Sequence, residues 1–204
     1  GGGAAPAAPA APAREPAEAG GASAGLPQRC LQRLTREMRQ IEEQRPRHLE
    51  EHGLELAPSD PEGGDLRTLS LRIFTRGIDK ACKLGKELRA HGIDAIEFEV
   101  WIPDAFPVKP PRLRVIKPCF HEGSFFVFQH GALCMEILTA QGWTPAMSLP
   151  QLGVQVKTVM SQGGGTVAGG GHMGDPGPAG REPAWAVFCR IESTHSDWKV
   201  FSVA

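Results

Sequence analysis

The residue best suited to chemistry is Cys134, which lies in the segment HGALCMEILTAQGWTPAMS, residues 130–148. A glycine precedes it by three positions, four largely apolar residues follow it, and the chain returns through a Gly-Trp-Thr-Pro corner. A thiolate attacks an acyl carbonyl readily and leaves readily, so sulfur suits a relay that is loaded and then discharged. This frame predicts a thiol that receives a bulky acyl group. The alternative is an inert buried cysteine, because free cysteine is among the most buried residue types.

The other four cysteines, Cys30, Cys82, Cys119 and Cys189, have no comparable frame. Five is an odd number, the spacing is wide, and no Cys-x-x-Cys pair occurs, so we expect neither a disulfide framework nor a zinc site. We expect no metal and no cofactor. Cysteine usage of this kind fits a reducing compartment, the cytosol or the nucleus.

Charge and hydropathy argue against two classes of partner. The 204 residues carry 22 Lys and Arg against 23 Asp and Glu, a balance that does not indicate nucleic acid or an anionic membrane surface. No apolar run is long enough to span a bilayer. We therefore expect a soluble protein, and a monomer.

Composition divides the chain into one domain and its flanks. Residues 1–25 are almost entirely Ala, Gly and Pro with scattered charges, which predicts a disordered tail and does not resemble a signal peptide. Residues 26–162 have the patterns of one folded domain. Residues 163–184 are Gly-rich and predict a flexible linker. Residues 185–204 are apolar enough to contain a strand, but their place is not specified.

An amphipathic helix is predicted after residue 26. Its apolar residues recur at three- and four-residue steps: Leu31, Leu34, Met38 and Ile41. Another side of the helix carries the arginines Arg29, Arg33 and Arg36. This arginine stripe is either a solvated helix face or a docking surface for an acidic partner.

Three strands and two further helices follow. The strands lie within residues 66–75, 96–103 and 111–118, where apolar residues alternate: Leu69, Leu71 and Ile73, then Ile96, Phe98, Val100 and Ile102, then Leu113 and Val115. A polar helix with Leu84 and Leu88 separates the first two strands. Ser148 and Gln151 form a capping box that begins the last helix. This order predicts an α+β domain, with helices flanking an antiparallel meander.

Four motifs in this order resemble the ubiquitin-conjugating enzyme family. They are RLTREM in the first helix, FPVKPP between two strands, GALCMEIL around Cys134, and WTPA in the return corner. The Q-type branch is the more specific resemblance, because Trp143 lies nine residues after Cys134, with Gly142 as the extra residue, and because a helix separates the first two strands. The resemblance implies a UBC-like fold over residues 26–162.

The resemblance also implies an activity and partners. Cys134 would take ubiquitin as a thioester from an ATP-dependent activating enzyme and pass it to amine or hydroxyl groups of protein substrates. Gly131 would let the tail of ubiquitin approach the backbone. The arginine stripe would meet the activating enzyme. Ligase contacts would come from Phe106, Val108, Trp143, Pro145 and Ala146, with Val108 standing where the family usually has phenylalanine.

The chain departs from the family pattern in three places. It lacks the His-Pro-Asn triplet whose asparagine stabilises the oxyanion, and His130, Gln129 and His121 are candidate replacements, with His130 nearest to Cys134. The acidic residues usual before the next helix are absent. The two C-terminal helices of the family have no counterpart in residues 163–204.

Two other functions remain open. A scaffold of the same fold that has lost its chemistry would bind ubiquitin or a ligase without being charged. A cysteine hydrolase would use Cys134 with His130 or His121, although no third residue at a suitable spacing orients either histidine.

Overall fold

A computed structural model describes residues 25–60, 62, 65–121, 124, 126–173 and 178–195. The predicted disordered tail lies almost entirely outside the described residues, as do residues 196–204. Among the described residues, every helix is too short or too polar to cross a lipid bilayer.

The first helix, α1 (Gln28–Arg47), continues into a π-helical turn at His48–His52. Its inner face is buried: Cys30, Leu34, Glu37 and Ile41. The helix prediction is confirmed, but Leu31 was placed on the wrong side, since its side chain is 44% exposed. The buried face includes a carboxylate, Glu37, which an apolar pattern cannot reveal.

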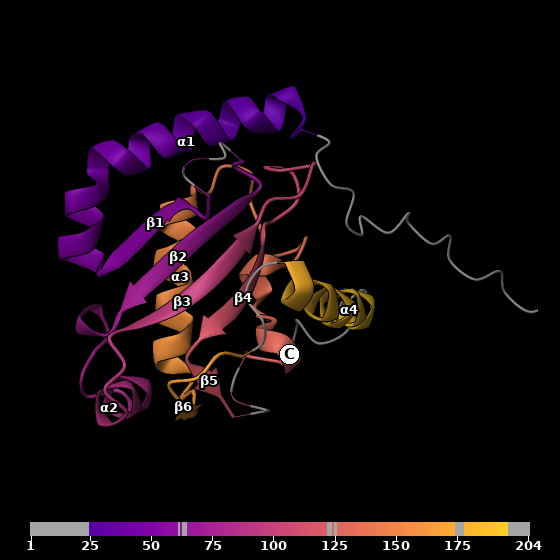
Figure 1. Cartoon of the computed structure of the whole chain (residues 1–204). Helices are drawn as coiled ribbons and strands as arrows, with labels where there is room; N and C mark the ends of the chain where they lie inside the picture. Colours follow the sequence, from indigo (N-terminus) through magenta and orange to yellow (C-terminus); the bar gives the residue numbers. More distant parts are fainter. Residues whose placement is uncertain are drawn as a thin grey trace, which may run out of the picture.

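Four antiparallel strands form the sheet in the order β1-β2-β3-β4 (Figure 1). They are β1 (Leu54–Pro58), β2 (Thr68–Phe74), β3 (Ala95–Trp101) and β4 (Arg112–Lys117). The predicted meander is confirmed, with Leu71 paired to Phe98 across β2 and β3. Strand β1 was not predicted, because it is short, ends in proline and is only partly buried. Its Leu56 pairs with Leu71.

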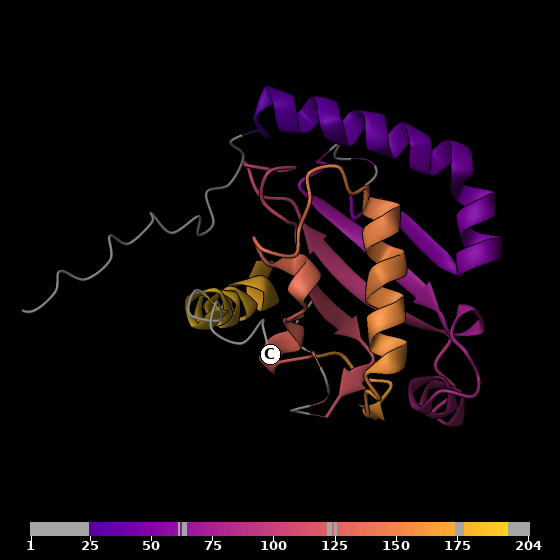
Figure 2. The same cartoon turned by 180° about the vertical axis from the view of Figure 1, so that it is seen from behind.

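Helix α3 (Leu149–Gln162) crosses one face of the sheet (Figure 2). The predicted capping box is confirmed, because Ser148 accepts from the backbone N–H of Gln151 and the Gln151 side chain accepts from the backbone N–H of Ser148. Gly153 lies where the helix meets the sheet: a Cβ there would be 3.3 Å from a methyl group of Leu71. The glycine costs about 1 kcal/mol of helix propensity and permits this close contact.

The predicted interlude helix is α2 (Lys83–Ala90), between the short 3₁₀ turn Thr75–Gly77 and β3. Leu84 and Leu88 are fully buried, as expected for the apolar side of this helix. Gly92 follows it with a φ of +64°, in the left-handed region typical of the residue that ends a helix.

The C-terminal part of the chain differs from its prediction. A strand was expected after residue 185, but α4 (Pro178–His195) is a helix on the sheet face opposite α3, near β4 (Figure 1). Its buried residues Gly180, Ala184, Val187 and Phe188 follow helical spacing, which the short apolar run AWAVF concealed. The expectation that no helix occurs in residues 163–204 is therefore wrong.

The predicted Gly-rich linker also contains regular structure. Residues Val167–Gly169 form β6, which pairs with β5 (Cys119–Phe120). Two hydrogen bonds hold this pairing next to the loop at Ser124: the Ser124 hydroxyl donates to the carbonyl of Thr166 at 3.0 Å and accepts from its N–H at 2.8 Å. Composition predicts chain flexibility, but it does not reveal these long-range partners.

Replacing Leu88 by Ala tests the docking of α2. We expect Leu88→Ala to lower the free energy of unfolding by about 2–5 kcal/mol, because it opens a cavity beneath a fully buried position. Lys86→Ala, on the exposed side of the same helix, should change it by less than about 0.5 kcal/mol. Chemical denaturation measures both, and equal losses would contradict this packing.

Candidate active site

Cys134 follows an extended segment that pairs with the edge of β4. The 3₁₀ turn Gln129–Gly131 leads into it. Ala132 bridges Arg114 of β4, and the Leu133 N–H donates to the carbonyl of Leu113 at 3.0 Å. The N–H of Cys134 itself donates to the carbonyl of Phe126 at 2.8 Å. Backbone hydrogen bonds on both sides thus determine where the sulfur lies.

The thiol of Cys134 is partly exposed, whereas its neighbours Leu133 and Met135 are buried in the core, at 1% and 2% exposure. The structure therefore does not enclose the sulfur fully in apolar side chains. Partial burial raises the pKa of the Cys134 thiol above its ordinary value, because desolvation disfavours the thiolate. The resting thiol is thus mostly neutral, and a partner must help it to ionise.

Gly131 is required by the close approach of this segment to β4. Its φ is +79°, and a Cβ there would lie 2.1 Å from the carbonyl oxygen of Val115. The sequence predicts that Gly131 leaves room for an incoming protein tail. In the structure the glycine is buried, and the backbone of β4 occupies that space.

The candidate donors before Cys134 lie at the surface. His130 is exposed and has a left-handed backbone, with φ of +58°. Gln129 is exposed in the same 3₁₀ turn, and Phe128 beside it is 46% exposed. His121 is also exposed, and its backbone N–H donates to the carbonyl of Thr166. His130 and Gln129 therefore share the loop that leads to Cys134, whereas His121 belongs to the β5–β6 end of the domain.

The return from Cys134 is a compact loop. It runs through a 3₁₀ turn at Glu136–Leu138, and the N–H of Trp143 donates to the carbonyl of Thr139 at 3.0 Å. Gly142, the extra residue in this loop, packs on the backbone: a Cβ there would lie 2.2 Å from the carbonyl oxygen of Glu136. The additional position therefore requires glycine.

Trp143 joins the return corner to the loop between β3 and β4. Its indole N–H donates to the carbonyl of Pro107 at 2.7 Å, and its ring centroid lies 6.3 Å from that of Phe106. Both rings are buried. Val108, at 74% exposure, projects from this support, and Pro145 and Ala146 are also exposed. The two predicted ligase-contact loops are thus one connected surface on a rigid base.

Arg33 and Glu37 hold the same corner against α1. Arg33 donates to the carbonyls of Pro145 and Met147, at 3.0 and 2.9 Å, and forms an ion pair with Glu37. The Glu37 carboxylate, 3% exposed, also accepts from the N–H of Leu149, the first residue of α3, at 2.7 Å. Arg33 was grouped with Arg29 and Arg36, but only those two are exposed.

Sequence reasoning missed the structural role of this pair. The available signal was that Glu37 continues the buried spacing of Cys30, Leu34 and Ile41 along α1. A carboxylate on a buried helix face needs a partner, and Arg33 one turn earlier is placed to provide one.

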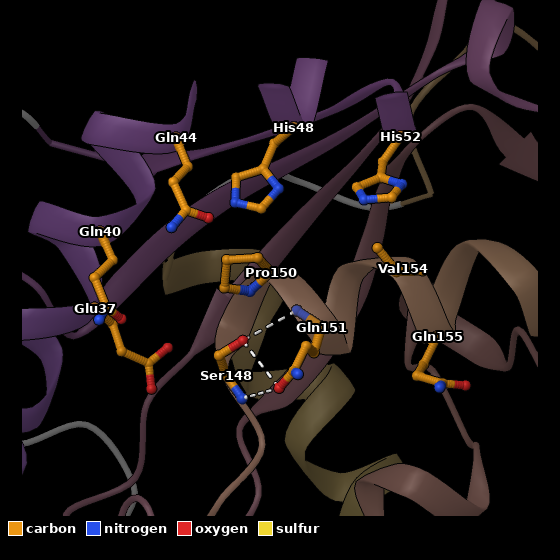
Figure 3. A pocket seen from close by; sticks show the side chains of 10 residues that line it. All are labelled: Glu37, Gln40, Gln44, His48, His52, Ser148, Pro150, Gln151, Val154 and Gln155. Carbon is orange, nitrogen blue, oxygen red and sulfur yellow. Dashed lines mark hydrogen bonds between the residues drawn. The ribbon is translucent and has the colours of Figure 1, made fainter. Parts of the chain in front are cut away.

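A separate polar cleft of about 420 Å³ lies between α1 and α3 (Figure 3). Its lining is mostly neutral, with Gln40, Gln44, His48 and His52 from α1 and its π turn opposite residues of α3. Burial, His52 and Arg47 lower the pKa of His48. The lining does not include the Cys134 segment. In the described part of the chain, no group of three or more His, Cys, Asp or Glu side chains is arranged to hold a metal ion.

The chain is similar to proteins of ubiquitin conjugation. Residues 91–164 match the family model described as ubiquitin-conjugating enzyme. The chain is 34% identical over 91 residues to ubiquitin-conjugating enzyme E2 Q-like protein CG4502 of Drosophila melanogaster, covering 45% of this chain and 29% of that protein. It is 28% identical over 121 residues to ubiquitin-conjugating enzyme E2 Q-like protein 1 of Homo sapiens, covering 59% and 73%.

Solved structures show the same fold. Human ubiquitin-conjugating enzyme E2 G1 superposes with a TM-score of 0.51, covering 67% of this chain and 98% of that chain. The sequence identity is 16%, so this similarity concerns the fold alone.

Removing the Glu37 carboxylate should loosen the corner and the start of α3 together. We expect Glu37→Ala to cost about 3–5 kcal/mol, because it leaves the partly buried Arg33 without its ion pair and the N–H of Leu149 without its acceptor. Urea denaturation measures the loss. Glu43→Ala, at an exposed position of α1, is the control. A loss below about 1 kcal/mol at Glu37 would contradict the role given to the pair.

Alanine substitutions at two glycines separate strain from collision. Gly131→Ala should destabilise the protein by more than Gly92→Ala, because both residues have positive φ but only Gly131 faces backbone at 2.1 Å. The conformational strain alone is worth about 1–3 kcal/mol. Thermal unfolding of both variants gives the difference. Equal losses would show that Gly131 does not approach β4 as described.

Proposed function

Because the chain belongs to the Q-type branch of the ubiquitin-conjugating enzyme family, we propose that it accepts ubiquitin as a thioester on Cys134 and transfers it to amine or hydroxyl groups of protein substrates. The observation that carries the proposal is the partly exposed sulfur of Cys134, in a segment fixed by backbone hydrogen bonds between two buried residues. Such a sulfur is accessible to a protein-sized donor and yet held in place.

The proposed loading step is a thioester exchange. The Cys134 thiolate attacks the carbonyl of ubiquitin's C-terminal residue, which the activating enzyme presents as a thioester. A new C–S bond to Cys134 forms, the C–S bond to the activating enzyme breaks, and that enzyme's sulfur leaves as a thiolate. ATP is consumed earlier, by the activating enzyme. Since burial raises the pKa of Cys134, the thiolate forms when the complex supplies a base or positive charge.

The surface proposed for the activating enzyme is the outer side of α1. Arg36 and Arg39 line a hollow of about 530 Å³ there, together with Leu31, an exposed apolar side chain. Arg29 is exposed near the start of the helix. Positive charge around one leucine suits an acidic partner with a small apolar contact. Arg33 contributes to this surface indirectly, by holding the return corner.

The surface proposed for a ligase combines Val108 with Pro145 and Ala146 over the Phe106–Trp143 base. Valine buries less area than the phenylalanine usual in the family, so binding to ligases that grip an aromatic residue should be weak. We propose His130 as the group that replaces the missing asparagine, because it is exposed in the turn that leads to Cys134. We propose a monomer that acts in the cytosol or nucleus.

A loading assay tests the proposal. With activating enzyme, ATP and ubiquitin, the full chain should form one adduct that a reducing thiol removes. Cys134→Ala should abolish it, and Cys134→Ser should convert it to an ester that resists the thiol, because an oxygen ester exchanges poorly with thiols. Cys189→Ser, at an exposed cysteine of α4, is the matched control and should load normally.

The absence of any adduct with the intact chain would contradict the enzyme assignment. Ubiquitin binding without loading would support the scaffold alternative of the same fold. Turnover of a ubiquitin ester that depends on Cys134 would support a hydrolase.

A further inference from the structure

Helix α4 packs on the outer face of β3 and β4 through aromatic side chains (Figure 1). The ring of Trp185 meets that of Trp101 edge to face, with centroids 5.0 Å apart, and Phe188 meets Trp185 in the same way at 5.6 Å. The guanidinium of Arg112 lies over Trp185, 5.2 Å from the ring centroid. These contacts make Trp185 the centre of the docked face of α4.

A buried ion-pair network adds direction to this packing. Arg114 of β4 donates to Glu99 of β3 at 2.9 Å, and both side chains are buried. Arg181 of α4 forms an ion pair with the other carboxylate oxygen of Glu99 and donates to the hydroxyl of Thr68 at 3.3 Å. Because both oxygens of Glu99 are engaged, α4 has one favoured position on the sheet.

The docked helix reaches the segment that carries the thiol. Ala132, two residues before Cys134, is fully buried and forms a cluster with Ala184, Val187 and Phe188 of α4. Ala132 bridges Arg114, so its side chain lies on the outer face, whereas Leu133 points into the main core. In an extended segment, side chains alternate between faces. Cys134 therefore opens on the side of the sheet where α4 lies.

We infer that α4 positions Cys134, and that Trp185 and Phe188 are positioning residues that act through Ala132. The docked helix presses the segment 129–133 onto β4 and forms one wall beside the thiol. Its effect on acyl transfer rests on the proposed function, but its effect on the thiol does not. The small cluster of α4 and Ala132 is separate from the main core, so α4 can leave the sheet while that core stays folded.

The closing experiment measures the thiol and the transfer separately. The full chain and the variants Trp185→Ala, Trp185→Phe and Glu182→Ala are alkylated with iodoacetamide from pH 7 to 10, and each cysteine is followed by peptide mass spectrometry. Glu182 is exposed on α4 and is the matched control. Cys82, which caps α2, is the internal reference, and Cys30, fully buried in the main core, reports general unfolding. Loading with ubiquitin is measured in parallel.

In Trp185→Ala, release of α4 should hydrate the Cys134 thiol and lower its pKa. Its alkylation at pH 7.5 should then rise about threefold, the change in thiolate fraction for a shift of half a pKa unit. Ubiquitin loading should fall by about ten- to a hundredfold, because the sulfur is no longer held in place. Trp185→Phe should restore most of both properties, Glu182→Ala should match the parent, and Cys82 and Cys30 should be unchanged.

An unchanged alkylation profile and unchanged loading in Trp185→Ala would overturn the inference. If Cys30 becomes reactive, the core has unfolded and Phe188→Leu, a smaller change at the Ala132 contact, decides by the same two readouts. A shifted alkylation profile in a chain that never loads would support the positioning role and contradict the proposed function.

Discussion

The free edge of β4 is the constraint on which the site depends. A sheet edge exposes unpaired backbone groups, and here the segment before Cys134 covers that edge by bridging Arg114 and donating to Leu113. The fit is so close that residue 131 must be glycine. Covering the edge and placing the sulfur are thus a single structural event, and Cys134 is the first side chain of the segment that is not buried.

Two further contacts hold the segments on either side of that edge. The Arg33–Glu37 pair joins α1 to the return corner and to the first turn of α3. On the opposite face, the Glu99 network and the aromatic rings bring α4 against Ala132. Buried ion pairs contribute little net stability, but they do favour one arrangement over its alternatives, and we infer that this is their role here. The cysteine loop is therefore held from both ends and from one face.

Local pattern predicted the parts of the fold that depend on local pattern. Alternation at Leu69, Leu71 and Ile73 identified β2, and Ser148 with Gln151 identified the start of α3. Strand β1 and helix α4 were missed because their partners are distant in sequence and their apolar runs are short. The predicted site residues around Trp143 are brought together, whereas Arg33 turned inward, because a stripe of like charges does not show which member has an internal acceptor.

The account stands or falls on which sulfur carries the acyl group. After incubation with activating enzyme, ATP and ubiquitin, the charged chain can be digested at acidic pH and its cysteine peptides weighed by mass spectrometry. The account predicts that the C-terminal residues of ubiquitin are attached to the peptide of Cys134, by a bond that hydroxylamine cleaves. Attachment to Cys82, Cys119 or Cys189 instead, or to a lysine alone, would contradict it.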